Sequence, residues 1–375
     1  MRVAVVTHYW SPHVGGIERV ALLQAQALAR AGHEVTVFTS RLRGDAAVAK
    51  NDGVTVRRFR CVNSLERRLS VPVPLMAPSM LVALFRYVDP RTVVIAHGHV
   101  YIGSVYAALA SRRAHAAFVV VQHNPFVDYG TFLNRIQSAV DRSIGRRVLH
   151  FARLVACVSE HTADHVLSIA PRAAVIVGVN GVDTSRFRPL EETSKVGASP
   201  RYVLTVRRLV PRNGVDLLLE AWVSGGLGER AELLIVGVGP EEARLRSLAQ
   251  GDPSVRFLGA VDDDELAALH RGAEVFVLPT RSGEGYGLVA AEALASGVPV
   301  ITTSEGRRSG VISDGRNGIV LAQDDAASLS AAISMLLTDH EQRDRLADGA
   351  RQTGPKLDWA AVLEGFVHRV ESLAA

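Results

Sequence analysis

Residues 275–303, VFVLPTRSGEGYGLVAAEALASGVPVITT, decide the fold because they contain two apolar strands with one helix between them. Residues 275–278 and 298–301 are short apolar runs rich in β-branched side chains, which is typical of buried parallel strands. Residues 288–295 are mostly strong helix formers, and Ser296-Gly297 ends this helix. The stretch is therefore predicted to form a βαβ unit.

The loop inside this unit has the composition of a ligand-binding loop. Residues 281–287 contain too much glycine for a helix, and the amides of residues 285–287 are expected to face open space at a helix N-terminus, a potential anion site. Glu284 lies in the loop and Glu292 lies eight residues later in the helix, so the two are not an i,i+4 pair. This layout suits a ligand with an anionic centre and hydroxyl groups on either side, as in a nucleotide sugar.

The phrase EGYGLVAAEALASGVPVI, which begins at Glu284, resembles the signature of the retaining glycosyltransferases of family 4, a Glu followed by seven residues and a second Glu. The resemblance implies an α/β GT-B fold, with two Rossmann-like doubly wound domains facing a cleft. It also implies that Glu284 faces the donor sugar and that Glu292 holds the nucleotide ribose. The alternative is that the two glutamates only solvate a helix end.

Length and composition indicate a two-domain globular protein. The chain has 375 residues, of which 48% are hydrophobic and 21% are charged. The sequence contains no uninterrupted apolar run of membrane-spanning length, and the N-terminus enters a strand at once, so we expect neither a signal peptide nor a membrane span. Cys61 and Cys157 have no metal-ligand spacing, which favours a cytoplasmic location.

The basic residues are unevenly placed. Residues 1–185 carry 21 basic and 11 acidic side chains, whereas residues 186–375 carry 21 basic and 27 acidic ones. The first half is therefore expected to meet an anionic surface or acceptor, and a membrane leaflet fits this expectation. Neither aromatic interleaving nor a recognition-helix motif supports nucleic acid as a partner.

The first strand, residues 3–7, runs into a loop that contains Gly15 and Gly16, and a helix over residues 17–31 follows. Glycine lets backbone amides approach a phosphate closely, but a bare Gly-Gly is more often a plain turn, and the GxGxxG spacing is absent. The wider phrase resembles the opening of family 4. That resemblance implies that this loop approaches the donor diphosphate and the acceptor.

Histidines follow the next strands, which are predicted at residues 54–60, 92–96 and 117–122, with a helix over residues 101–111. Ligands of doubly wound sheets bind at the carboxyl ends of the strands, where His97, His99 and His123-Asn124 fall. His123 resembles the histidine that family 4 places against the transferred sugar and the acceptor. His97 and His99 are interpreted as ordinary loop residues.

Residues 64–88 combine arginines with a long apolar run, SLERRLSVPVPLMAPSMLVALFRYV. One interpretation is that this segment docks on lipid as a peripheral membrane element. The other is that it forms an ordinary amphipathic helix packed on the sheet. The sequence favours neither.

Stretches rich in polar and turn-forming residues indicate the limits of the domains. We predict an acceptor-binding domain over residues 1–185, a polar linker at residues 191–200 and a nucleotide-sugar-binding domain over residues 199–355. An amphipathic helix begins near Asp358, and the family resemblance implies that residues 356–375 cross back to the first domain.

The second domain begins with a strand at residues 202–206 and departs from the family at two positions. Arg208 matches the diphosphate-binding arginine of family 4, and Gly237 lies in a turn that lines the family's nucleotide pocket. Asn213 stands where a lysine is usual, and Gly310 stands where a glutamate is usual. A missing cation is expected to be supplied by an extra arginine, with Arg307 and Arg308 preferred over Arg207 and Arg212.

No metal site is expected. Asp262, Asp263 and Asp264 could suggest an Asp-x-Asp metal motif, but they directly precede a helix, so N-capping and helix-dipole stabilisation explain them. No other carboxylate or His/Cys cluster has ligand spacing. Arg208 and helix amides would then stabilise the leaving group, with neither a metal nor another cofactor.

The resemblance implies transfer of a hexosyl unit, such as mannosyl or glucosyl, from a nucleotide diphosphate sugar to a lipid, glycan or small-molecule hydroxyl with retention. The alternative is a non-catalytic nucleotide-sugar-binding partner or regulator. The expected catalytic residues are His123 and Glu284, and the expected donor-binding residues are Gly15, Gly16, Arg208, Asn213, Gly237, Gly285, Tyr286, Gly287 and Glu292.

Overall fold

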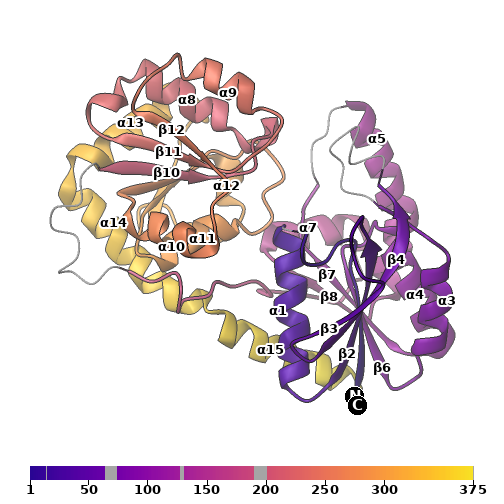
Figure 1. Cartoon of the computed structure of the whole chain (residues 1–375). Coiled ribbons are helices and arrows are strands. Elements are labelled where there is room, and N and C mark those ends of the chain that lie inside the picture. Colours follow the sequence, from indigo (N-terminus) through magenta and orange to yellow (C-terminus); the bar gives the residue numbers. More distant parts are fainter. Residues whose placement is uncertain (14, 64–73, 127–130, 190–200, 375) are drawn as a thin grey trace. The chain divides into compact units, whose positions relative to one another are not determined.

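The computed structural model describes residues 1–13, 15–63, 74–126, 131–189 and 201–374 (Figure 1). The chain divides into two compact units. Unit 1 comprises Met1–Asn180 together with Ala360–Ala375, and unit 2 comprises Gly181–Trp359. Each unit is built around one sheet, with helices on both faces of that sheet. The linker predicted at residues 191–200 lies outside the described residues.

Unit 1 is a mixed sheet that is parallel at its centre. Its strand order is β3-β4-β2-β1-β6-β7-β8-β9, with β5 paired to β4, and only β3 and β5 pair antiparallel with their neighbour. The elements are β1 (Arg2–Val6), α1 (Gly16–Arg30), β2 (Glu34–Arg41), β3 (Val48–Asn51), β4 (Val54–Val62), β5 (Leu75–Met76), α3 (Ser79–Tyr87), β6 (Thr92–His97), α4 (Ile102–Ala114), β7 (Ala117–Gln122), α5 (Thr131–Val140), the π-helix η1 (Asp141–Gly145), α6 (Arg146–Phe151), β8 (Leu154–Cys157), α7 (Glu160–Ile169), β9 (Val175–Val177) and α15 (Trp359–Ala374).

Unit 2 is a parallel sheet with the order β12-β11-β10-β13-β14-β15. Its elements are β10 (Tyr202–Val206), η3 (Pro211–Asn213), α8 (Val215–Ser224), η4 (Leu227–Glu229), β11 (Glu232–Val236), α9 (Glu242–Leu248), β12 (Val255–Gly259), α10 (Asp263–Gly272), β13 (Val275–Leu278), α11 (Leu288–Ala295), β14 (Val300–Thr302), α12 (Ser304–Arg307), β15 (Gly318–Val320), α13 (Ala326–Thr338), α14 (His340–Thr353) and η5 (Gly354–Leu357).

The βαβ unit of residues 275–303 is confirmed as β13, α11 and β14. Alternate residues of β13 enter different cores, Val275 and Val277 on one face of the sheet and Phe276 and Leu278 on the other. A strand buried on both faces must be apolar at every position, which explains the continuous run. The sheets of the two units confirm the predicted two-domain α/β architecture.

The strand order places loops together at one edge of each sheet. β1 pairs with β2 on one side and β6 on the other, and β10 pairs in the same way with β11 and β13. Crossovers leave these central strands in opposite directions, which makes the strand ends a topological switch point where ligands bind. The loops after β1 and β6, and those after β10 and β13, are therefore the places to look for a site within each unit.

Two local predictions can be compared with the structure. The side chain of Asp262 accepts hydrogen bonds from the backbone N–H groups of Asp264 and Glu265, so the predicted N-cap of α10 is confirmed. Of the ambiguous segment 64–88, residues 64–73 lie outside the described residues. The remainder contains α3, which buries Met80, Ala83 and Leu84 in the core of unit 1.

His270 shows that unit 2 buries an uncharged imidazole. Its ring lies 5.6 Å from the ring of Phe187 and 5.2 Å from that of Phe276, measured between centroids, and it is fully buried. Burial lowers the pKa of His270 to about 3 because the charged ring would lose its hydration. The ring is therefore neutral throughout the physiological range.

This burial predicts a loss of stability in acid. The unfolded chain takes up a proton on His270 below about pH 6.5 and the folded chain only near pH 3, so the free energy of unfolding falls as the pH drops through that window. At pH 5 the loss from this ring is expected to be about 2 kcal/mol. Denaturant unfolding at pH 7.5 and pH 5 should show a smaller pH dependence for His270→Leu than for wild type. The exposed His340 provides the control, and an equal change in His340→Leu would contradict the assignment.

Candidate functional site

Glu284 is a buried carboxylate in the loop after β13. Its Oε2 accepts a hydrogen bond from Nη1 of Arg207 at 2.9 Å and another from Oγ1 of Thr280 at 2.8 Å. Burial alone would raise the pKa of Glu284, but the charge of Arg207, these two hydrogen bonds and the backbone N–H of Gly287 hold it below its ordinary value. Glu284 is therefore charged and fixed in orientation at neutral pH.

Arg207 connects Glu284 to Asn213. Nη2 of Arg207 donates to Oδ1 of Asn213 at 2.8 Å, and Nδ2 of Asn213 donates to the carbonyl of Arg208 at 2.7 Å. A lysine ammonium has no acceptor and would put a second positive charge beside the guanidinium. Asn213 is thus matched to Arg207.

The nitrogen Nε of Arg207 is buried and has no hydrogen-bond partner within the described structure. The Arg207 side chain is only 10% exposed. A buried N–H that is left unsatisfied costs free energy, so a ligand oxygen at this position would stabilise the site.

The extra cation beside Asn213 is therefore Arg207, and the sequence-based preference for Arg307 and Arg308 is replaced by this finding. Both of those residues are exposed, and Nη1 of Arg308 lies 3.5 Å from a carboxylate oxygen of Glu305. Gly310 is exposed with a φ of +82°, in the left-handed region that favours glycine.

The loop at the start of α11 differs from the prediction that the amides of residues 285–287 face open space, because Gly285 and Gly287 are buried. Gly287 occupies the N-cap position and no side-chain hydrogen bond caps the helix. Its backbone N–H faces the carboxylate of Glu284, so the anion at this amide is supplied by the chain itself. Gly285 is buried, and burial raises the pKa of the half-buried Tyr286, which keeps this phenol neutral.

Glu292 lies on α11 in a different environment from Glu284. It is 6% exposed, and its Oε2 lies 3.8 Å from Nε2 of His270, too far for a hydrogen bond. Because His270 is neutral, it supplies no counter-charge to Glu292. The two glutamates therefore differ in kind: Glu284 is held by a cation, whereas Glu292 lies beside a neutral ring.

Arg208 and Gly237 complete the predicted donor-binding set of unit 2. Arg208 follows β10 with an exposed side chain. Gly237 follows β11, and a Cβ atom at this position would lie 1.9 Å from the carbonyl oxygen of Arg207. Only glycine permits this approach, so Gly237 fixes the backbone that carries Arg207.

In unit 1, His123 forms a buried pair with His97. Nε2 of His123 lies 2.9 Å from Nδ1 of His97, and the two rings are stacked. Burial lowers the pKa of His123 to about 3 and that of His97 well below its ordinary value. His123 is therefore neutral at physiological pH and can take part in hydrogen bonds to a sugar but cannot supply positive charge.

The loop with Gly15 and Gly16 is covered by a carboxylate of α1. Gly15 is the N-cap and Gly16 the first residue of α1, and a Cβ atom on Gly15 would lie 2.1 Å from Oε2 of Glu18. Burial would raise the pKa of Glu18, but a hydrogen bond from His13 and the charge of His8 lower it below its ordinary value. His8 is in turn stacked on Tyr101, with centroids 4.3 Å apart.

The structure thus brings the predicted residues together in two groups, one in each unit. In unit 2, Arg207 joins Glu284 to Asn213, and both Thr280 and the backbone N–H of Gly287 bind Glu284. In unit 1, His123 contacts His97, which the sequence analysis interprets as an ordinary loop residue. The sequence offered one usable signal for these partners, since His97 ends a buried strand and Thr280 follows one, and both strands end at the switch point.

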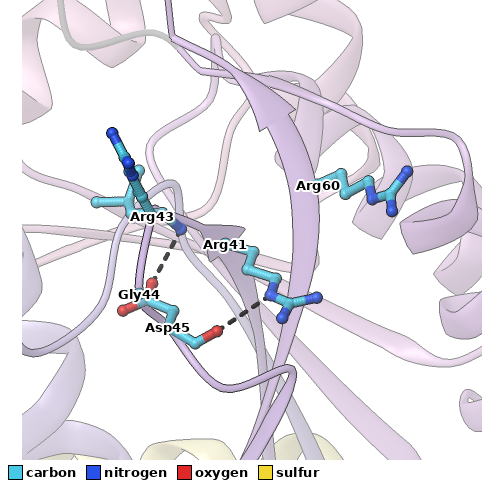
Figure 2. Close-up of a pocket in the computed structure, with 6 residues that line it drawn as sticks. Arg41, Arg43, Gly44, Asp45 and Arg60 are labelled. Atoms are coloured by element: carbon cyan, nitrogen blue, oxygen red, sulfur yellow. Dashed lines mark hydrogen bonds between the residues drawn. The ribbon is translucent and has the colours of Figure 1, made fainter.

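A further hollow, of about 410 Å³, lies in unit 1 at the turn after β2. Figure 2 shows Arg41, Arg43 and Arg60 around this turn, with Nε of Arg41 donating to the backbone carbonyl of Asp45. All three arginines are exposed, so the hollow presents positive charge to solvent.

Comparison with known proteins covers almost the whole chain. Residues 14–186 match the family model described as Glycosyltransferase Family 4, and residues 189–353 match that described as Glycosyl transferases group 1. A GDP-mannose-dependent alpha-(1-6)-phosphatidylinositol monomannoside mannosyltransferase of Mycobacterium tuberculosis is 30% identical over 370 residues, which cover 94% of this chain and 93% of that protein. A D-inositol 3-phosphate glycosyltransferase of Geodermatophilus obscurus is 28% identical, with 98% and 88% covered.

Solved structures agree in fold. Sucrose-phosphate synthase from Thermosynechococcus elongatus superposes with a TM-score of 0.80 at 21% identity over the full length of both chains. HepE from Anabaena, solved in complex with UDP, superposes with a TM-score of 0.76 at 18% identity and covers 99% of this chain and 100% of its own.

The different environments of the two glutamates predict that substitution of Glu284 impairs turnover and that substitution of Glu292 impairs nucleotide binding. Glu284→Gln should lower turnover and leave nucleotide affinity near that of wild type, because the charge paired with Arg207 is lost while the nucleotide contacts remain. Glu292→Ala should weaken nucleotide binding by at least about tenfold, the effect of losing one hydrogen bond to a charged group. Calorimetry with nucleotide and steady-state kinetics separate the two effects. Equal nucleotide affinity in Glu292→Ala and wild type would exclude the ribose contact.

The contact between Arg207 and Asn213 predicts that Asn213→Lys has opposite effects on turnover in the presence and in the absence of Arg207. Arg207→Ala should lower turnover roughly 100-fold, as expected for the loss of a charge-stabilising donor. In the wild-type background, Asn213→Lys should lower turnover, because the lysine and Arg207 repel each other. In the Arg207→Ala background, the same change should raise turnover, because the lysine restores a cation.

The pH–rate profile adds a second readout for the same variants. Without Arg207 the pKa of Glu284 should rise, which moves the acid limb of the profile to higher pH. Replacing the exposed Arg230 with alanine serves as the control. Equal effects of Asn213→Lys in both backgrounds would show that Arg207 and Asn213 act independently.

Proposed function

This chain belongs to glycosyltransferase family 4, and from that premise we propose that it transfers a mannosyl unit from GDP-mannose to a hydroxyl of an inositol-containing acceptor. The protein is a glycosyltransferase that uses a nucleotide-sugar donor, and the catalytic interpretation is favoured over a non-catalytic binding partner. The choice of GDP, mannose and inositol is the new part of the proposal.

The observation that carries the proposal is the near full-length similarity to the mycobacterial mannosyltransferase, whose name specifies both GDP-mannose and a phosphatidylinositol mannoside. A second relative, with 98% of this chain covered, acts on an inositol phosphate. The two names share an inositol acceptor that carries a phosphate. That shared chemistry supports an anionic inositol acceptor for this chain.

The proposed reaction retains anomeric configuration by a front-face route. Glu284 is held by Arg207 and Thr280, so it is placed to orient a sugar hydroxyl rather than to attack as a nucleophile. The departing diphosphate oxygen takes the proton of the acceptor hydroxyl, and His123, neutral in its buried setting, orients the sugar.

The charge that develops on the departing diphosphate would be met by Arg207, Arg208 and the first amides of α11 after Gly287, whose own N–H faces Glu284. Gly15, Gly16 and Gly237 would line the donor, and Glu292 would hold the ribose. This scheme uses neither a metal ion nor a cofactor at the leaving group.

The acceptor is proposed to be reached at an anionic membrane surface. The exposed Arg41, Arg43 and Arg60 around the hollow of unit 1 can pair with lipid phosphates, as can the basic excess of residues 1–185. Within the described residues, the structure contains no helix that is long and apolar enough to cross a membrane. Peripheral contact on the cytoplasmic face fits these charges.

Transfer assays with a small panel of substrates test the proposal. The chain should transfer mannose from GDP-mannose to phosphatidylinositol mannoside presented in anionic vesicles, faster than to soluble inositol 3-phosphate. Binding to these vesicles should weaken as salt rises, because the Debye length is only about 8–10 Å at physiological ionic strength. GDP should raise the melting temperature more than UDP does.

His123→Ala supplies the matched control, because it should bind GDP with wild-type affinity and lose transfer. Turnover with UDP-sugars alone would overturn the choice of donor. Faster transfer to the soluble inositol phosphate would overturn the membrane acceptor while leaving the glycosyltransferase activity intact.

A further inference from the structure

Three potential metal ligands from distant parts of the sequence meet inside unit 1. His99 follows β6, Asp141 is the first residue of the π-helix η1, and His165 lies on α7. Nε2 of His99 lies 3.0 Å from Oδ1 of Asp141, and Nε2 of His165 lies 3.8 Å from Oδ2 of the same carboxylate. The sequence alone indicates no such cluster, because these residues are too far apart in the chain for any motif spacing to show them.

The hydrogen bonds around His99 fix which of its nitrogens carries a proton. Nε2 of Gln122 donates to the carbonyl of Asn124 at 2.9 Å, which leaves Oε1 of Gln122 facing Nδ1 of His99, also at 2.9 Å. Nδ1 of His99 is therefore the N–H donor, and Nε2 is the nitrogen that faces the Asp141 carboxylate. A histidine whose other nitrogen is held by a side-chain oxygen has the arrangement of a metal-bound histidine.

Nε2 of His99 and Oδ1 of Asp141 are 3.0 Å apart, and two such atoms rest this close only when a proton or a metal ion lies between them. The group between them is either a proton shared by His99 and Asp141 or a metal ion. All three side chains are strongly buried, with exposed fractions of 3% for His99, 5% for Asp141 and 12% for His165. A buried carboxylate requires a partner charge, and a divalent ion would satisfy it together with both imidazoles.

We propose that His99, Asp141 and His165 form a binding site for a divalent transition-metal ion of the zinc type. Their three ligand atoms lie within 4.8 Å of one another. Bonds of about 2.0–2.1 Å are usual for zinc, so His165 closes toward Asp141 on binding, and water completes the coordination. Two imidazoles and one carboxylate select zinc and related ions over magnesium and calcium, which prefer oxygen ligands.

The site would stabilise the segment that carries His123. Gln122, which orients His99, directly precedes His123 in the chain, and β6, β7, η1 and α7 are joined through the ion. The ion is therefore placed to fix Gln122 and His123 at the end of β7, whereas the groups proposed to act on the leaving group belong to unit 2. Loss of the ion should lower the melting temperature even when no donor is present.

Metal binding to the full-length chain tests the proposal without any transfer assay. After removal of metals with a chelator, zinc titration by calorimetry should show one ion per chain, and elemental analysis after gel filtration should recover it. Cobalt in place of zinc should give the visible absorption of a site with nitrogen and oxygen ligands.

Variants identify the ligands. Asp141→Asn and His165→Ala should each weaken zinc binding by more than 100-fold. Gln122→Ala, which leaves all three ligands and removes the hydrogen bonds of Gln122 to His99 and Asn124, should weaken it by roughly 10- to 100-fold. His150→Ala, an exposed histidine of α6, is the control and should bind zinc as wild type does. Circular dichroism of each metal-free variant shows whether it is folded.

Three outcomes would overturn the proposal. One is the absence of a one-to-one zinc complex in wild type. The second is binding that Asp141→Asn and His150→Ala affect equally, which would assign the zinc to surface histidines. The third is a doubly protonated His99 ring, seen by nitrogen NMR in the presence of excess zinc, which would identify the cation as a proton.

Discussion

The backbone of the loop from Arg207 to Gly214 is clamped between neighbouring loops, and the candidate donor site depends on this constraint. A Cβ atom on Gly214 would lie 1.8 Å from the carbonyl oxygen of Pro279, and one on Gly237 would lie 1.9 Å from that of Arg207. The chain segments after β10, β11 and β13 therefore touch through bare backbone. This contact is what brings Arg207 and Glu284, which are 77 residues apart, within hydrogen-bond distance.

The charged groups of this site fix one another's orientation more than they stabilise the fold. A buried ion pair such as Arg207 with Glu284 gains little over an apolar pair, because desolvation offsets most of the attraction. Its hydrogen bonds to Thr280 and Asn213 instead hold each charged group in one orientation. In unit 1 the same effect is reached without charge, since His97 and His123 are buried as neutral rings that contact each other. Fixed polar groups of this kind need little reorganisation when a substrate binds.

Much of the fold could be predicted from sequence because it depends on local patterns. The apolar run of residues 275–278 predicted β13, and Asp262 predicted the start of α10, since strand burial and N-capping act over a few residues. The candidate site was predicted only in part. Glu284 and His123 stand in recognisable phrases, but the partners Arg207 and His97 are set by which strands lie side by side. The triad of His99, Asp141 and His165 was missed for the same reason, because a parallel sheet joins residues that no spacing rule connects.

The left-handed backbone at Gly310 constrains how this chain can change during evolution. A glutamate at this position, as is usual in family 4, would cost about 1–2 kcal/mol in backbone strain because its φ is +82°. A single substitution of Gly310 by glutamate is therefore penalised unless changes at neighbouring positions rebuild the turn. Without such changes, glycine is the residue that this turn accepts best.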